Sequence, residues 1–211
     1  GGVGILVQTT CLPQFATGPL FTEPQAGRIA RLSLVGNFGA LDVWSIHLDF
    51  AVSATERNSQ LRTIASCSSA HDSVHSVYAG DFNFDFEVGD RFDPGAACFV
   101  GAPGTELRTW NELFSPPAHV REWFQEAQPR VRSGGGRQSR LDRIYATLHR
   151  AMHADLNSET YLPWPWTMHF SASDHRPVVN RLVRRTQPNS APPPIPHWVA
   201  AHPAWQPTLR R

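Results

Sequence analysis

Short apolar runs that stop at an acidic, amide or imidazole side chain are the feature that most constrains the fold of this chain. Most of these runs alternate with the period of a strand, whereas residues 53–66 between two of them have helical spacing. Strands are predicted at residues 3–7, 28–35, 41–48, 73–79, 141–146 and 178–183. Two sheets packed face to face with helices outside fit this order, because loops at one rim of such a scaffold bring distant residues together.

The segments between these strands carry turn and capping signals. Residues 37–39, Asn-Phe-Gly, predict a hairpin between the second and third strands. Ser53 or Thr55 is the expected N-cap of the helix that follows. Further helices are predicted at residues 106–114 and 148–156, whereas residues 84–104 and the run Gly134–Gly136 are expected to be irregular.

Length and composition favour one globular domain. The chain has 211 residues, of which 41% are apolar and 18% charged. The tail from Gln187 onward holds seven prolines without a periodic pattern, which predicts a linker. No apolar run reaches the roughly 18 to 20 residues needed to cross a bilayer. Three widely spaced cysteines indicate neither a disulfide framework nor a zinc site, so an intracellular location is expected.

The balance of charge does not identify a partner. Nineteen cationic residues, all of them arginine, face eighteen acidic ones, and the net charge is +1. The whole molecule therefore has no strong basic field of the kind that marks many nucleic-acid-binding proteins. The exclusive use of arginine is explained either by phosphate binding or by a biased base composition of the gene.

Polar groups suited to phosphodiester chemistry occur at the ends of the predicted strands. They form the segments His47-Leu48-Asp49, Gly80-Asp81-Phe82-Asn83, Arg140-Leu141-Asp142-Arg143 and Ser173-Asp174-His175, with Arg57 and Gln60 on the first helix. Hydrolysis of a phosphodiester needs a cation that neutralises phosphate charge, a group that orients or deprotonates water, and a donor for the leaving oxygen. Each segment alone also has a structural explanation as a strand end, a turn or an ion pair.

In chain order these segments resemble the successive motifs of the endonuclease/exonuclease/phosphatase superfamily, with Gly2-Val3-Gly4-Ile5-Leu6 in front of them and Arg176-Pro177 behind. The resemblance covers residues 1–183. It implies an α/β four-layer sandwich of two face-to-face mixed β-sheets flanked by helices, followed by a Pro-rich linker or tail at residues 184–211. Members carry an asparagine and a metal-binding glutamate on earlier strands. The first strands are therefore expected to be missing from this chain.

The resemblance implies a role for each matching catalytic residue. His175 would act on the scissile phosphate or its attacking water, and Asp142 would hold the His175 imidazole. Asp81 would orient or activate water. Asn83 would donate a hydrogen bond to a phosphate oxygen, and His47 would assist the leaving oxygen or bind phosphate.

The resemblance further implies a metal and a substrate. Asp174 would lie at a Mg²⁺ site that Mn²⁺ also fits, while Arg137 and Arg140 would contact substrate phosphates. DNA is the expected partner, because the tail is similar to the segment between the endonuclease and the reverse transcriptase of some non-LTR retrotransposon polyproteins. That similarity implies a reverse transcriptase domain in a parent polyprotein and a nuclear location. A phosphatase or phosphodiesterase acting on inositol phosphates or lipids, and a non-catalytic relic, are the alternatives.

Overall fold

The computed structural model describes residues 2–37, 39–69, 71, 73–114, 120–123, 132–134, 137–147, 156–161, 175 and 177–184. A six-stranded mixed sheet with the order β1-β2-β3-β4-β10-β7 is its largest element. The strands are β1 (Leu20–Gln25), β2 (Ile29–Gly36), β3 (Gly39–His47), β4 (Val74–Asp81), β10 (Asp142–Thr147) and β7 (Val120–Glu122). Only β3 and β4 run parallel, and helix α1 (Ala54–Cys67) connects them.

Two smaller sheets contain the remaining described strands. One has the order β6-β5-β9-β8, and the other is the antiparallel pair β11-β12. Their strands are β5 (Arg91–Asp93), β6 (Cys98–Phe99), β8 (Arg132–Gly134), β9 (Arg137–Ser139), β11 (Leu156–Tyr161) and β12 (Val179–Arg184). The other helical elements are α2 (Thr105–Phe114) and the 3-10 turns η1 (Thr9–Gln14) and η2 (Val88–Asp90).

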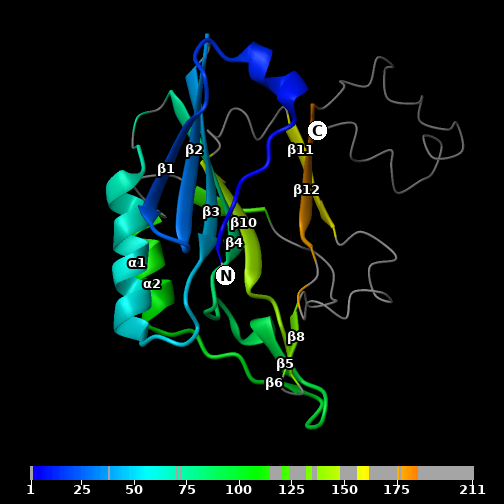
Figure 1. The fold of residues 1–211 in the computed structure, drawn as a ribbon. Helices are drawn as coiled ribbons and strands as arrows, with labels where there is room; N and C mark the ends of the chain where they lie inside the picture. Colours follow the sequence, from blue (N-terminus) through cyan, green and yellow to red (C-terminus); the bar gives the residue numbers. More distant parts are fainter. Residues whose placement is uncertain are drawn as a thin grey trace, which may run out of the picture.

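The elements are arranged in layers. Figure 1 shows α1 and α2 side by side against one face of the six-stranded sheet, with the β11-β12 pair on the other side of that sheet. The predicted mixed α/β architecture with more than one sheet is confirmed. Both described α-helices cover the same face of the sheet, so the apolar core lies on that face and polar side chains can occupy the opposite face.

An aromatic core fixes the helices on the sheet. Trp44 of β3 stacks on Tyr78 of β4 with ring centroids 5.7 Å apart, and Trp110 of α2 stacks on Phe114 at 4.3 Å. Tyr145 of β10 lies 4.6 Å from the Trp110 ring. All five rings are at most 3% exposed. Burial of rings of this size is the largest favourable contribution to such a core.

Helix α1 begins as the sequence predicts and is tied to α2 by an ion pair. Ser53 is the N-cap, and it forms a reciprocal capping box with Glu56. Arg57 donates to the Glu106 carboxylate at the start of α2 at 2.6 and 2.9 Å. Gln60 accepts a hydrogen bond from the Asp49 backbone N–H at 3.3 Å. Arg57 and Gln60, which belong to the polar segments of the sequence, therefore hold the helix and the loop after β3.

Gly80 permits the close approach of β3 and β4. It pairs with Ile46 in the parallel ladder and has a φ of 144°. A Cβ atom at this position would lie 1.8 Å from the Ile46 carbonyl oxygen, which no side chain tolerates. The glycine before Asp81 is thus required by strand packing.

The first predicted strand is wrong. Residues 3–7 alternate between half-buried and exposed, but they belong to none of the described sheets, and Leu6 is fully exposed. A short apolar run indicates that some side chains are covered, whereas a strand also needs a neighbour at hydrogen-bonding distance.

Two segments expected to be irregular contain short strands. Residues 84–104 include β5 and β6. Gly134, the first glycine of the other segment, ends β8 and pairs with Arg137 of β9. Strands of two or three residues are too short to show a period. The predicted helix at 148–156 lies outside the described residues except for Leu156, which begins β11, and the expected tail lies outside them from residue 185 onward.

Two properties of the described part agree with the composition. None of its helices combines the length and the apolar character that a membrane span requires. Its three cysteines, Cys11, Cys67 and Cys98, carry free thiols.

We predict that Gly80→Ala lowers the free energy of unfolding by at least about 3 kcal/mol, because the new methyl group meets backbone and φ stays positive. Urea denaturation would measure the loss. Gly18→Ala is the matched control, since nothing lies within 4 Å of its Cβ position, and it should change stability by less than about 0.5 kcal/mol. Equal denaturation midpoints for the two variants would contradict the steric explanation.

Candidate active site

Three polar residues from three adjacent strands lie in one row. In the parallel ladder His47 of β3 pairs with Asp81 of β4, and in the antiparallel ladder Asp81 pairs with Asp142 of β10. All three are partly exposed, whereas their sequence neighbours Ile46 and Phe82 are buried in the core beneath the helices. The period of two therefore directs the row to the face that the helices leave open.

His175 joins this row from a distant part of the chain. Its Nδ1 lies 2.8 Å from Asp142 Oδ2, and its Nε2 lies 3.9 Å from Asp81 Oδ2. The first distance is a hydrogen bond, and the second is too long for one. Because the carboxylate accepts, Nδ1 carries a proton and Nε2 is turned toward Asp81. The expected pairing of His175 with Asp142 is thus present in the geometry.

Asn83 holds the Asp81 carboxylate. Its backbone N–H donates to Asp81 Oδ1 at 2.9 Å, and its Nδ2 donates to Asp81 Oδ2 and to the Leu48 carbonyl, each at 2.8 Å. The φ of Asn83 is 50°, a left-handed conformation that asparagine tolerates better than most residues. Both amide hydrogens of Asn83 have intramolecular acceptors, so this geometry favours a positioning role over the expected bond to phosphate.

His47 is bound by an arginine that the sequence analysis assigned no role. Arg28 Nη1 lies 3.1 Å from His47 Nδ1, and Arg28 Nη2 donates to Asp49 Oδ2 at 2.5 Å. A guanidinium has donors only, so Nδ1 of His47 must accept, and the ring proton of the neutral imidazole lies on Nε2. The predicted hairpin could have identified this contact, because its pairing of Ile29 with Ile46 brings Arg28 opposite His47.

The pKa of Asp81 is raised. Burial of the carboxylate is the main cause, and repulsion from Asp142 is the second. The backbone N–H of Asn83, His175 and His47 each lower the pKa and offset part of this effect. The carboxylates of Asp81 and Asp142, paired across β4 and β10, therefore repel each other.

Arg140 lies in an environment that corrects its expected role. Its guanidinium is buried and bonds Asp90, Glu87 and Glu122, at 2.9, 2.8 and 3.3 Å respectively. Arg143 is 1% exposed and pairs with Asp90 and Glu122. These acids lie far along the chain, up to 53 positions from Arg140, so the sequence offered no sign that they neutralise it.

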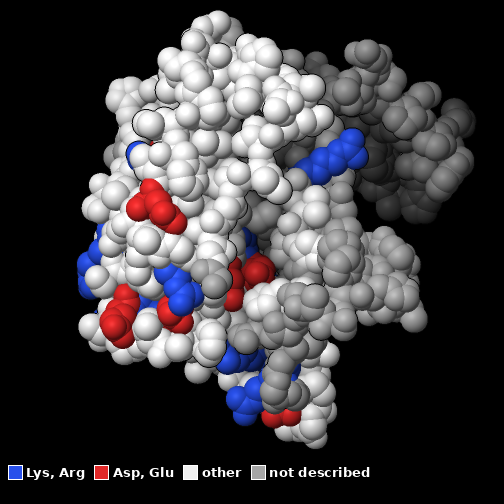
Figure 2. All heavy atoms as spheres, viewed as in Figure 1, with Lys and Arg blue, Asp and Glu red and all other residues white. Residues whose placement is uncertain are grey.

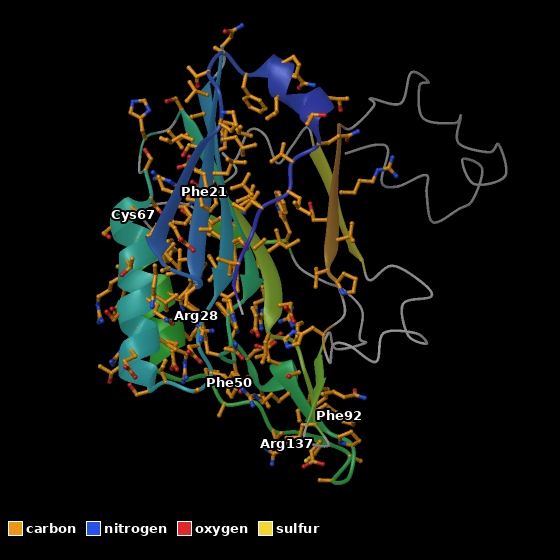
Figure 3. All side chains as sticks on the ribbon, in the orientation of Figure 1. Phe21, Arg28, Phe50, Cys67, Phe92 and Arg137 are labelled. Carbon is orange, nitrogen blue, oxygen red and sulfur yellow. The ribbon has the colours of Figure 1, made fainter. Side chains whose placement is uncertain are left out.

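Arg137 remains available at the surface. Its side chain is 57% exposed and lies 3.7 Å from Asp93. Figure 3 places it on the small sheet at the lower end of the molecule. In Figure 2 acidic atoms lie deep in a hollow near the centre of the same view, and cationic atoms lie below them.

The described residues fit a divalent cation only if the substrate completes its shell. No group of three or more His, Cys, Asp or Glu side chains suited to a metal occurs among them, and Asp174 lies outside them. Magnesium, however, is often held by one or two carboxylates together with water and substrate phosphates. The repulsion between Asp81 and Asp142 is the observation that favours a cation here, because a cation would balance it.

Comparisons with known proteins show what the fold of this chain is similar to. No family model and no curated protein sequence matches the chain. The chain is similar to the endonuclease domain of TRAS1, a telomere-specific non-LTR retrotransposon, with 15% identity, 80% of this chain and 70% of that chain covered, and a TM-score of 0.53. It is also similar to D. rerio TDP2 complexed with single-strand DNA product, with 16% identity, 79% and 67% covered, and a TM-score of 0.53.

We predict opposite shifts of the Asp81 pKa in two variants. Asp142→Asn should lower it, because the repelling charge is lost, and His175→Gln should raise it, because a stabilising charge is lost. Carboxyl ¹³C resonances followed by NMR during an acid titration in metal-free buffer would report both. The raised pKa also affects stability, because the folded protein binds the Asp81 proton more tightly than the unfolded chain does. The free energy of unfolding should therefore fall as the pH rises from the pKa of the unfolded chain through the raised pKa of the folded protein. Shifts of the same sign would contradict the assigned causes.

Proposed function

Because the chain has the fold of the endonuclease/exonuclease/phosphatase superfamily, we propose that it is a divalent-metal-dependent phosphodiesterase that cleaves DNA. One observation carries the proposal: His175 bonds Asp142 at 2.8 Å and turns its other nitrogen toward Asp81 at 3.9 Å. A histidine oriented by a carboxylate beside a second, partly buried carboxylate is suited to proton transfer during hydrolysis.

Each residue of this site has a separate task in the proposed reaction. Asp81, fixed by Asn83, orients the attacking water and accepts its proton as the water oxygen bonds phosphorus. His175, fixed by Asp142, accepts a hydrogen bond from the same water at Nε2 and so helps to aim it at the phosphate. As the bond from phosphorus to the leaving oxygen breaks, His47 offers its Nε2–H to that oxygen or to the phosphate. Bound Mg²⁺, beside Asp81 and with Asp174 as a further expected ligand, would neutralise phosphate charge.

DNA is the proposed substrate for two reasons. Both similar structures act on or bind nucleic acid by their names, one as an endonuclease and one with a single-strand DNA product. Arg137 presents an exposed guanidinium on the small sheet, although Arg140 and Arg143 are neutralised internally. A reverse transcriptase domain in a parent polyprotein and a nuclear location stay predictions.

We predict that the protein nicks supercoiled plasmid with Mg²⁺ or Mn²⁺ and stops when EDTA is added. His175→Ala and Asp81→Asn should each slow nicking about a hundredfold or more, because each removes a group aimed at the reacting phosphate. Gel electrophoresis of relaxed and supercoiled forms would measure the rates. His71→Ala is the matched control, since His71 is exposed and, among the described residues, its ring bonds only nearby Ser73.

The result also separates the alternatives. Release of phosphate from inositol phosphates or a lipid, without nicking, would replace DNA by a small-molecule or lipid substrate. No hydrolysis of either class by a folded protein, with His175→Ala indistinguishable from it, would leave a non-catalytic relic and contradict the proposal.

We predict that DNA binding weakens with salt and that Arg137→Ala makes this dependence shallower, by about 0.9 in the slope of log K against log salt, as expected for one lost phosphate contact. Fluorescence anisotropy with a labelled duplex in metal-free buffer would measure it. Arg108→Ala is the control, because the Arg108 side chain lies on α2 and is 75% exposed. An unchanged slope in Arg137→Ala would show that Arg137 makes no contact with DNA phosphate.

A further inference from the structure

A pocket of about 310 Å³ lies next to the candidate active site and takes no part in the reaction proposed above. It is bounded by the end of β1, the loop after β3 and the outer side of α1. Arg28 and Asp49 line it, and the same Arg28 bonds His47. Figure 3 shows Arg28 beside α1 toward the lower end of the sheet, where β3 ends. The pocket is therefore one arginine side chain away from the row His47, Asp81 and Asp142.

The pocket contains a buried polar side chain with hydrogen-bonding capacity left over. Gln60 is 7% exposed, and its Oε1 accepts from the Asp49 backbone N–H at 3.3 Å. That bond fixes the orientation of the amide, because only the oxygen can accept. Its Nε2 group has no acceptor within the described part of the chain, although a buried amide ordinarily uses its donors. The unused donor is available to a ligand that accepts hydrogen bonds.

Two further side chains add neutral hydrogen-bonding groups. The Ser59 hydroxyl and the Gln25 amide both line the pocket, and neither has a hydrogen-bond partner among the residues that the structure describes. Hydroxyl and amide groups both donate and accept. The pocket thus suits a ligand that presents donors and acceptors on one edge.

The charges of the pocket disfavour an anion. Arg28 is neutralised by Asp49, whereas Glu56 adds a second carboxylate whose only described bonds are within the helix cap. One guanidinium and two carboxylates leave an excess of one negative charge. A phosphate group would be repelled, and a neutral polar group would not.

We infer that this pocket binds the nucleoside, sugar and base without phosphate, that adjoins the scissile phosphate. The inference rests on the proposed function, which puts a phosphodiester over Asp81 and His175, and it adds a subsite beside that phosphate. A polymer places a neutral nucleoside next to every phosphate, so a pocket that repels phosphate and lies one side chain from the row matches the repeat of the substrate. Its volume is at the lower end of the range for small-ligand sites.

The test is an NMR titration of the full chain with deoxyadenosine and with thymidine in metal-free buffer, read at the side-chain amide of Gln60. Saturable movement of that signal is expected. Ser59→Ala should weaken binding about fivefold, as for one hydrogen bond worth about 1 kcal/mol. Ser66→Ala is the matched control, an exposed serine of the same helix whose hydroxyl donates to Thr63. Its affinity should equal that of the unchanged protein.

The charge argument has its own test. Thymidine monophosphate should bind more weakly than thymidine, and Glu56→Gln should reduce that difference. A Gln60 signal that neither nucleoside moves, or equal affinities in Ser59→Ala and Ser66→Ala, would overturn the subsite. Plasmid nicking without nucleoside binding would overturn the subsite alone, whereas nucleoside binding without nicking would overturn the proposed function alone.

Discussion

The register of β3, β4 and β10 is the constraint on which the rest of this structure depends. A shift of one residue in any of the three strands would turn His47, Asp81 or Asp142 toward the aromatic core and bring a core residue to the open face. Gly80 holds this register from the inside, because β3 approaches it too closely for any other residue. The polar row and the hydrophobic core are therefore two consequences of the same pairing.

The acidic side chains in the row and those close to it have different partners. On both sides of Asp142 in the chain, Arg140 and Arg143 neutralise the fully buried Asp90 and so fix the start of β10. Breaking such a buried pair leaves an uncompensated charge, which makes it an effective anchor for position even where its net stabilisation is small. Within the row, burial and repulsion from Asp142 raise the pKa of Asp81. The structural acids are paired with arginine, whereas in the candidate site Asp142 pairs with His175 and Asp81 accepts hydrogen bonds from Asn83.

The sequence was informative where a signal is local. The strands near β2, β3, β4, β10 and β12, the cap at Ser53 and the helix α2 follow from periodicity and capping chemistry. The resemblance that the ordered motifs carry also predicted that His47, Asp81, Asn83, Asp142 and His175 lie together. Partners could not be predicted in this way, because nothing local joins Arg140 to Asp90, fifty positions away. A solvent-facing and a buried arginine look identical in a sequence, and residues 3–7 look identical to a paired strand.

The partners of the two histidines of the site place the ring proton on different nitrogens. Asp142 accepts from Nδ1 of His175, so the inward Nε2 of a neutral His175 has a lone pair. Arg28 donates to Nδ1 of His47, so the inward Nε2 of a neutral His47 has a proton. One ring thus offers an acceptor and the other a donor at the same pH, without any difference in the rings themselves. In the proposed reaction the proton of water goes to Asp81, so the acceptor of His175 would orient that water, while the donor of His47 would serve the leaving oxygen or the phosphate.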